Sequence, residues 1–481
     1  MNATFPLQTP ASGPTGGTAA SPPPTAAVTT ALLQTAGLPV ELAAQALLTG
    51  ADPVVPSSFA VGTAAQASIA AAALAASALG QARGLPPQRI AVDMRHAAVE
   101  CTGWFSIDGT VPPLWDAFSG LYQAADGWVR VHANFAHHRK GALRLLGLDP
   151  ATAQRTDAER AMQSWRAIDF EQAAADAGMV ATALRSFAEW DATPQARAIA
   201  AQPLFTLRRI GDAPPRALPP LPAGARPLHG IRVLDLTRIL AGPVGGRALA
   251  AYGADVMLVN APHLPNIDAI ADTSRGKRSA HVDLRAEAGQ ATLRRLAGEA
   301  HVFLQGYRPG GLQARGFGPE ALAAMRPGIV HVSLSAYGTQ GPWAGRRGFD
   351  SLVQTATGFN HAEAEAAGSA TPKALPMQIL DEATGYFMAL GASAALVRQQ
   401  EEGGSWHVEV SLAQTGHWLR SLGRVAGGLA QAMPGAAPYV DTVPSGFGTL
   451  AAIRHSAQFE ATPAGWDRLS VPPGTDMAQW D

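Results

Sequence analysis

Residues 228–243 read LHGIRVLDLTRILAGP, and this stretch decides the fold expected for the second half of the chain. Its apolar run at 231–236 predicts a short buried strand, and the Ala-Gly-Pro that follows leads into a helical stretch at 244–252. The same alternation continues downstream, with strands expected at 255–259, 301–304 and 329–334 and helices at 287–300 and 319–325. Apolar strands that alternate with helices are typical of a parallel sheet with helical crossovers, so we expect an α/β fold.

A long helix is expected next, at 381–402. Asp381 opens it, the pair Gly403-Gly404 ends it, and a strand follows at 407–412. No Gly-x-Gly-x-x-Gly follows the first strand of the sheet, which argues against a dinucleotide cofactor.

The composition of the chain argues against several classes of protein. Of its 481 residues, 47% are hydrophobic and 15% are charged, so a large core is expected. The formal net charge is -1 without clustered Lys and Arg, so nucleic acid is not expected as a partner. The apolar stretch 64–79 is short and dominated by alanine, and we interpret it as a buried helix instead of a membrane span. The single cysteine, Cys101, and the lack of a visible secretory signal favour a cytoplasmic protein.

Ordered motifs in the second half carry a family resemblance. They are the opening stretch 228–243, YGADVMLV at 252–259, RGKRS at 275–279 with VDLR at 282–285, GYRPG at 306–310, SAYGTQGP at 335–342, GFD at 348–350 and LDEATG at 380–385. In this order they resemble family III CoA-transferases, the group of formyl-CoA, carnitine-CoA and bile-acid-CoA transferases, whose superfamily includes α-methylacyl-CoA racemase. The resemblance implies a parallel Rossmann-like large domain with a smaller α+β domain.

The order of the segments differs from that of the family. Residues 112–205 look like the family's small domain, yet they precede the large domain. Residues 59–84 align without gaps to 378–403, with Gly62 in the place of Asp381, which suggests a rearrangement by partial tandem duplication. The expected organisation is a disordered tail at 1–30, a degenerate partial copy of the large domain at 31–111, the small domain at 112–205, a Pro-rich linker at 206–227, the large domain at 228–420 and a C-terminal segment packed on it at 421–481. We expect the two partial copies to assemble one active site, either as an intrachain pseudo-dimer or within the interlocked homodimer that the family forms.

The resemblance implies that Asp381 is the nucleophile. A carboxylate that attacks a thioester gives a mixed anhydride and then an aspartyl-CoA thioester, which splits one difficult exchange into easier steps. The expected function is therefore the transfer of coenzyme A between an acyl-CoA and a free carboxylic acid, with the CoA thioester as substrate and no tightly bound cofactor. The alternative role of Asp381 is a helix N-cap. The family's glycine-rich loop, which supplies oxyanion donors, has no convincing counterpart in 112–205.

Several residues are candidates for binding CoA. Arg285 and Arg347 stand where the family commonly places Lys to meet the nucleotide, and Arg308 lies in the Tyr-Arg-Pro-Gly turn. The alternative for each arginine is a solvated surface residue. Ala241, Gly242 and Pro243 resemble the turn that lets CoA approach the backbone, and the alternative is simple helix initiation. The family usually has Lys, Glu and Arg at the positions of Leu258, Asn260 and Ala314. These differences bear on how tightly, and in which pose, the adenosine end of CoA is bound.

Two rival functions stay open. Racemases of the superfamily have a His where this chain has Phe349, so proton transfer at the α-carbon loses one of its bases and transfer is favoured. A non-catalytic acyl-CoA-binding relative is the other rival. His132, His137 and His138 fit no zinc pattern, so we expect a surface loop there and no metal site.

Overall fold

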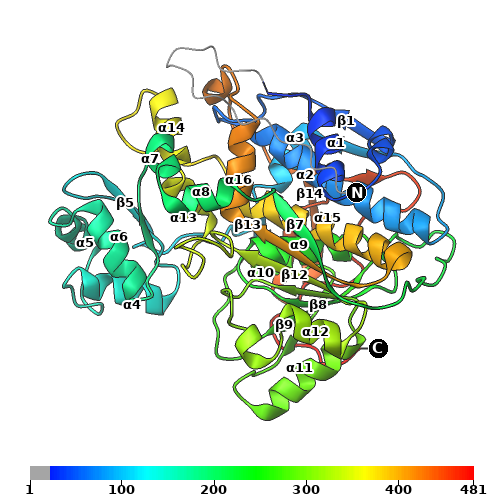
Figure 1. Cartoon of the computed structure of the whole chain (residues 1–481). Coiled ribbons are helices and arrows are strands. Elements are labelled where there is room, and N and C mark those ends of the chain that lie inside the picture. The colour runs from blue at the N-terminus through cyan, green and yellow to red at the C-terminus, as the bar shows by residue number, and fades with distance from the viewer. Residues whose placement is uncertain (1–21, 481) are drawn as a thin grey trace.

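The computed structural model describes residues 22–480 and is built around a seven-stranded sheet (Figure 1). The strand order is β10-β9-β8-β11-β12-β13-β7, in which the first six strands are parallel and β7 runs antiparallel to β13. The strands are β7 Phe205–Gly211, β8 Arg232–Leu236, β9 Asp255–Asn260, β10 Lys277–His281, β11 Val302–Gln305, β12 Val330–Ser335 and β13 Ser405–Ser411. The predicted α/β fold with a parallel sheet is confirmed.

The direction of chain progress through the sheet reverses between β8 and β11. From β8 the chain adds β9 and β10 on one side, and β11 then returns to the other side of β8. In open parallel sheets, ligands bind in the crevice at the carboxyl ends of the strands where this reversal occurs.

Helices cover both faces of the sheet. On one face, α9 (Ala241–Ala251) and α15 (Ile379–Glu402) share a core with Val233 of β8. On the other face, α11 (Glu287–Glu299) and α12 (Pro319–Met325) contribute to a core that takes the next residue, Leu234. Because the successive side chains of Val233 and Leu234 enter different cores, both faces of the strand are apolar at its centre, which explains the adjacent apolar residues at 233–234.

The Ala-rich helix α2 (Val61–Ala82) packs against α15. Its length and composition would allow it to cross a membrane, but 94% of its most apolar 18-residue stretch is buried inside the protein. Small alanine side chains let the two helices approach closely over their length. The interpretation of 64–79 as a buried helix is confirmed.

The first part of the chain extends this core. The helix α1 (Thr25–Thr35) packs on α2 and buries Leu32 and Leu33, so the predicted disordered tail is wrong for 25–30. Residues 1–21 of that predicted tail lie outside the described residues. A small sheet joins β1 (Ala46–Thr49), β2 (Ile90–Asp93) and β16 (Gln458–Phe459).

The predicted linker at 206–227 is wrong for its first six residues. Residues 206–211 belong to β7, which pairs with β13 and covers the edge of the main sheet. An uncovered edge strand would leave its backbone groups unpaired, and β7 supplies their partners. Residues 212–227 carry no regular helix or strand.

A separate small unit, residues 120–183, has its own core around Tyr122, Val129 and Phe170. Figure 1 shows it at one side of the main sheet. Its antiparallel sheet and helices are β4 Gly120–Gln123, β5 Trp128–Val131, α4 Ala136–Leu145, α5 Arg155–Met162, α6 Ala167–Asp176 and β6 Ala181–Ala183.

The C-terminal residues tie the two halves together. Trp480 enters the core beneath the main sheet, whereas β15 pairs with β3 and β16 pairs with β2 of the first half. The remaining elements are α3 Met94–Glu100, β3 Phe105–Ile107, α7 Phe187–Asp191, α8 Pro194–Ala200, α10 Ile270–Thr273, α13 Asp350–Ala356, α14 Phe359–Ala366, α16 Leu412–Ser421, β14 Val440–Ser445, β15 Gly448–Ile453 and four 3-10 turns at Val40–Gln45, Gln313–Arg315, Gly428–Ala430 and Ala437–Tyr439.

Candidate active site

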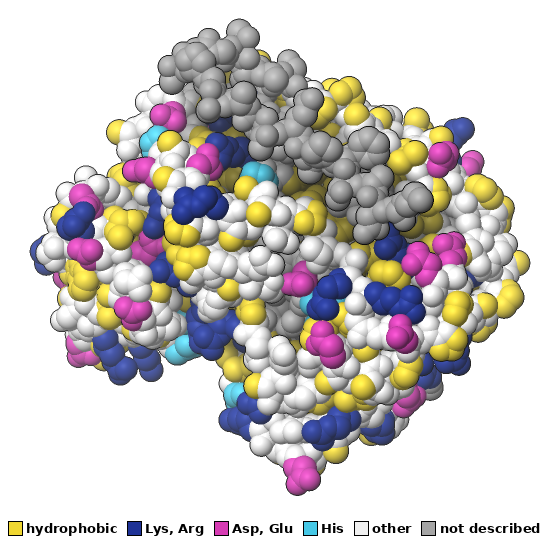
Figure 2. Space-filling view, in the orientation of Figure 1, with side chains coloured by type: hydrophobic (Ala, Val, Ile, Leu, Met, Phe, Trp, Pro, Cys, Tyr) yellow, Lys and Arg dark blue, Asp and Glu magenta, His cyan; other side chains and the backbone are white. Residues whose placement is uncertain are grey.

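A pocket of about 380 Å³ lies where the chain reverses direction in the sheet. Leu236 at the end of β8, Gly306 after β11 and Ser335 at the end of β12 line it, and Phe135 and His138 of the small unit close one side. Figure 2 shows basic side chains beside the indentation between the small unit and the helices below the sheet. The pocket therefore occupies the position in which parallel sheets bind their ligands.

Four arginines line this pocket. They are Arg238, Arg308, Arg346 and Arg347. The structure thus brings together two of the predicted CoA-binding residues, Arg308 and Arg347. Guanidinium groups suit phosphate oxygens because they present several donors in one plane. Arg238 and Arg346 were missed, although Arg238 closely follows β8 and Arg346 adjoins the predicted residue Arg347.

The predicted residue Arg285 lies elsewhere. Its exposed side chain pairs with Asp283 two residues earlier, with 2.7 Å between Nη2 and Oδ2, and it is not among the residues lining the pocket. This is the alternative of a solvated surface arginine.

The turn between β8 and α9 forms one wall of the pocket. Ile239 has φ of 78°, a conformation that β-branched residues rarely adopt, and its side chain borders the pocket. Asp235 holds the turn by accepting hydrogen bonds from the backbone N–H of Thr237 at 2.9 Å and from its Oγ1 at 2.5 Å. The buried Lys277 donates to the other oxygen of Asp235 at 2.9 Å.

Ala241, Gly242 and Pro243 are the first three residues of α9 and are buried. They are not among the residues lining the pocket. A Cβ at Gly242 would lie 2.4 Å from Cβ of Thr237, so glycine lets the turn fold back on the helix. The structure matches the helix-initiation alternative for these residues.

Asp381 is the third residue of α15 and is buried at 8% exposure. The N-cap is Gln378, and no side chain caps the helix there, so the N-cap alternative for Asp381 is wrong. The backbone N–H of Asp381 donates to Oδ2 of Asp350 at 3.0 Å. Sequence reasoning placed Asp350 in a motif but did not single it out as a partner of Asp381.

The two aspartates form a coupled carboxyl pair. Burial, and then the neighbouring carboxyls of Asp350 and Glu382, raise the pKa of Asp381 well above its ordinary value. Burial raises the pKa of Asp350 to about 7, while Arg130 of the small unit favours its ionised form. Because two buried carboxylates repel each other, the pair retains a proton near neutral pH.

The small unit covers the loop that leads to Asp350. The ring of His132 stacks on Phe349 with 3.9 Å between centroids, and Nη1 of Arg347 donates to Nε2 of His138 at 3.0 Å. The predicted surface loop is therefore wrong for His132 and His138, which are 5% and 3% exposed. Burial lowers the pKa of His132 to about 4 and that of His138 to about 3, so both imidazoles are neutral.

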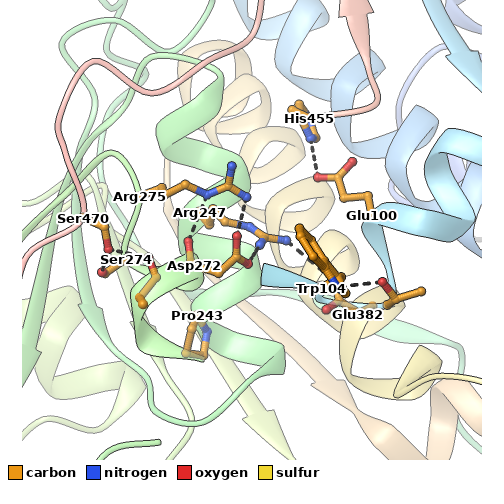
Figure 3. Close-up of polar contacts among 12 residues, drawn as sticks. Glu100, Trp104, Pro243, Arg247, Asp272, Ser274, Arg275, Glu382, His455 and Ser470 are labelled. Atoms are coloured by element: carbon orange, nitrogen blue, oxygen red, sulfur yellow. Dashed lines mark hydrogen bonds and ion pairs between the residues drawn. The ribbon is translucent and has the colours of Figure 1, made fainter. Parts of the chain in front are cut away.

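Glu382, the residue after Asp381, belongs to a buried polar network (Figure 3). Its Oε2 lies 3.9 Å from Nη2 of Arg247, which also pairs with Asp272. Beyond them, Glu100 accepts from Tyr386 and from His455, each at 2.8 Å. Burial raises the pKa of Glu382 to about 8, so this carboxyl adds a second proton next to Asp381. The network joins α3, α9, α10 and α15 to the C-terminal segment.

Asp381 does not itself line the arginine pocket. Phe349 does, and the residue after it accepts the hydrogen bond from Asp381. The pocket and Asp381 are therefore connected through the adjacent residues Phe349 and Asp350. Among residues 22–480, no group of three or more His, Cys, Asp or Glu side chains is arranged to hold a metal ion.

Comparison with known proteins identifies the second half. Residues 228–436 match the family model described as CoA-transferase family III. This region belongs to CoA-transferase family III.

Several curated proteins resemble this family III region. A probable fatty acyl-CoA transferase of Mycobacterium tuberculosis is 33% identical over 202 residues, covering 39% of this chain and 51% of that protein. Succinate–glutarate CoA-transferase of Agrobacterium fabrum is 32% identical over 268 residues, covering 50% and 66%. The α-methylacyl-CoA racemase of Mus musculus is 37% identical over 100 residues, covering 21% and 26%. The chain spans 34% to 51% of the length of the first three curated relatives.

Solved structures overlap a similar share of the chain. A crystal structure of the Mycobacterium tuberculosis protein Rv3272 has 33% identity and a TM-score of 0.38, covering 41% of this chain and 58% of that one. A CAIB/BAIF family protein from Brucella suis has 27% identity and a TM-score of 0.35, covering 47% and 65%. The family III assignment rests on sequence, and the duplication stays a prediction.

Proposed function

We propose that this protein transfers coenzyme A from an acyl-CoA to a free carboxylic acid, with Asp381 as the nucleophile. One observation carries the proposal: a buried carboxyl pair, Asp350 and Asp381, adjoins a pocket lined by four arginines at the carboxyl ends of the sheet. The arginines suit the phosphates of CoA, and the pair supplies the attacking oxygen.

The proposed reaction starts when Asp381 is ionised. Its carboxylate attacks the thioester carbonyl, the C–S bond breaks and CoA leaves as a thiolate, which forms a mixed anhydride. The thiolate then attacks the aspartyl carbonyl, releases the donor acid as a carboxylate and forms an aspartyl-CoA thioester. The acceptor carboxylate reverses these two steps, which yields the new acyl-CoA and restores Asp381.

The residues around the pair have separate proposed roles. Arg130 stabilises negative charge on Asp350 and so lowers the pKa of that carboxyl. The proton that the two aspartates share can therefore pass between them. Opening of the stack between His132 and Phe349 admits the thioester, and its closure excludes water from the anhydride. The small unit of the same chain contacts the site, which supports the intrachain pseudo-dimer. The homodimer is the alternative proposal.

Trapping with hydroxylamine tests the proposal. During turnover, wild-type protein given an acyl-CoA and a free acid should yield a hydroxamate, because the anhydride is intercepted. Asp381→Asn should yield none, whereas Asp441→Asn, an exposed carboxyl paired with Arg454, should behave as wild type. A protein that only binds acyl-CoA would give no hydroxamate in any variant.

Racemisation is the second candidate, and one observation favours it. His132 places an imidazole on the ring of Phe349, the position at which racemases of the superfamily have their own histidine. Incubation of an α-methylacyl-CoA in heavy water, without an acceptor acid, decides between the two reactions. Deuterium uptake at the α-carbon that is lost in His132→Gln would replace transfer by racemisation as the proposed function.

A further inference from the structure

A second and larger cavity lies at the opposite end of the same parallel strands. It measures about 1030 Å³ and is bordered by Arg232, the first residue of β8, by Asp255, the first residue of β9, and by His301, which directly precedes β11. The proposed CoA pocket borders the carboxyl ends of β8, β11 and β12. The two cavities are therefore separate places on the molecule.

Arginine dominates the charge of this cavity. Six arginines line it, against two aspartates: Arg83, Arg216, Arg232, Arg278, Arg326 and Arg468 against Asp255 and Asp467. Both aspartates already have partners, because Asp255 pairs with Arg278 at 2.6 Å and Asp467 pairs with Arg226. The excess positive charge is not compensated by these two residues.

Three of the arginines meet no carboxylate among residues 22–480. Arg83 donates to the carbonyl oxygens of Pro219, Pro227 and His229, which are neutral acceptors, at 3.1, 3.2 and 2.9 Å. Arg326 donates to the carbonyl of Ala300 at 3.3 Å, and the side chain of Arg216 is exposed at the cavity. These contacts orient the guanidinium groups without reducing their charge.

The charges act on one another across the cavity. Burial and the positive charges of Arg326, Arg232, Arg216 and Arg83 lower the pKa of His301 to about 4, so four arginines surround one neutral imidazole. Burial and the charge of Arg216 also lower the pKa of Arg326. Like charges that face a common cavity repel, and an anion bound between them removes that cost.

We propose that this basic cavity binds a ligand that carries two or more phosphate groups. A single phosphate accepts from one or two guanidinium groups, whereas the three arginines without carboxylate partners come from three different segments of the chain. The volume is also at the upper end of what small-molecule sites occupy, which fits a chain of phosphates or a nucleotide better than a lone ion. This inference does not depend on the proposed transfer reaction.

Calorimetric titration with sodium tripolyphosphate tests the proposal, and ATP in a parallel titration shows whether a nucleoside adds affinity. The informative variant is Arg216→Gln/Arg326→Gln, because Arg216 is exposed and Arg326 is partly exposed, so the fold should tolerate both changes. We expect wild type to bind tripolyphosphate at low ionic strength and the double variant to bind at least about 10-fold more weakly. Arg160→Gln, a change at an exposed arginine of the small unit, is the matched control.

Three results would overturn the proposal. The first is no heat of binding in wild type at about 1 mM tripolyphosphate. The second is equal affinity in wild type and the double variant, with both shown to be folded by circular dichroism. The third is loss of tripolyphosphate binding in Arg308→Gln, which would assign the binding to the arginine pocket at the other end of the sheet. Loss of transfer activity leaves these measurements unaffected, so the two proposals fail separately.

Discussion

The helices α2 and α15 lie side by side and begin in a similar way, yet only one of them begins at a candidate active site. In each case an aspartate upstream of the helix accepts a hydrogen bond from the first turn. Asp52 accepts from the backbone N–H of Thr63 at 2.8 Å, and Asp350 accepts from that of Asp381 at 3.0 Å. Each aspartate follows a Gly-x pair, Gly50-Ala51 or Gly348-Phe349.

The difference lies at one position of the first turn. In the gapless alignment Gly62 occupies the place of Asp381, and a Cβ there would lie 2.4 Å from Oδ1 of Asp52 and 2.5 Å from Cγ2 of Val54. The beginning of α2 is therefore filled by its neighbours, whereas the beginning of α15 holds a second carboxyl group. An aspartate that ties down a helix is a structural device in both places, and the chemistry requires the additional acid.

The largest expected effect comes from removing that acid. Asp381→Asn should reduce CoA transfer by at least about 1000-fold, because the attacking oxygen is lost. Acyl-CoA binding, measured by calorimetry, should change by less than about 3-fold. The counterpart change at α2, Asp52→Asn, should leave transfer within about 2-fold of wild type. Transfer at the wild-type rate in Asp381→Asn would remove the distinction between the two helices.

A smaller effect is expected from changing Asp350, the aspartate that accepts a hydrogen bond from the first turn of α15 as Asp52 does from α2. Asp350→Asn retains an acceptor for the N–H of Asp381 but removes a neighbouring negative charge, so the raised pKa of Asp381 should fall. The nucleophile must be ionised, and the rising limb of the kcat profile should therefore move to lower pH. We expect a loss in kcat of about 10-fold to 100-fold at neutral pH because the position of the carboxylate is disturbed. An unchanged limb would mean that the two carboxyls titrate independently.

The arginine pocket beside α15 gives the next effect. Arg308→Gln and Arg347→Gln should each raise KM for acyl-CoA by about 10-fold, with kcat within about 3-fold, because phosphate contacts are made equally in the ground and transition states. Arg285→Gln is the matched control, since this side chain is exposed and pairs with Asp283. Steady-state kinetics at constant ionic strength measures all three. Equal changes of KM in the three variants would mean that the arginine pocket does not bind CoA.

The smallest expected effect is a change of stability at α2. Gly62→Ala should destabilise the protein by about 1–3 kcal/mol, because the added methyl meets Asp52 and Val54. Gly298→Ala, near the end of α11, has nothing within 4 Å and should be neutral or slightly stabilising. Chemical denaturation compares the two, and activity should be unchanged in both. A neutral Gly62→Ala would show that the beginning of α2 has room to spare.

Much of the second half could be predicted because its strands are buried on both faces. Predominantly apolar runs marked β8, β9 and β12, and the helix expected at 381–402 was observed as α15, Ile379–Glu402. The edge strand β7 was missed because its sequence, FTLRRIG, mixes apolar residues with two arginines and leads into a Pro-rich passage. An edge strand needs only one apolar face, so its pattern is weak.

The candidate site was predictable only in part. Asp381 and two pocket arginines stood in short motifs, whereas the burial of His132 depends on Phe349, more than two hundred positions away in the chain. Long-range contacts of this kind leave no local pattern. The same holds for the pairing of Asp350 with Asp381, because a backbone N–H that donates across two helices is invisible in a sequence.

The contact between α2 and α15 has a practical consequence for anyone who wishes to work with the family III region alone. A fragment limited to 228–436 would leave bare the flank of α15 that α2 covers, and it would lack β7 at the edge of the sheet. Such a fragment is expected to aggregate and to express poorly, whereas co-expression with 22–227 should restore its solubility. A boundary drawn by evolutionary similarity here cuts through one continuous hydrophobic core.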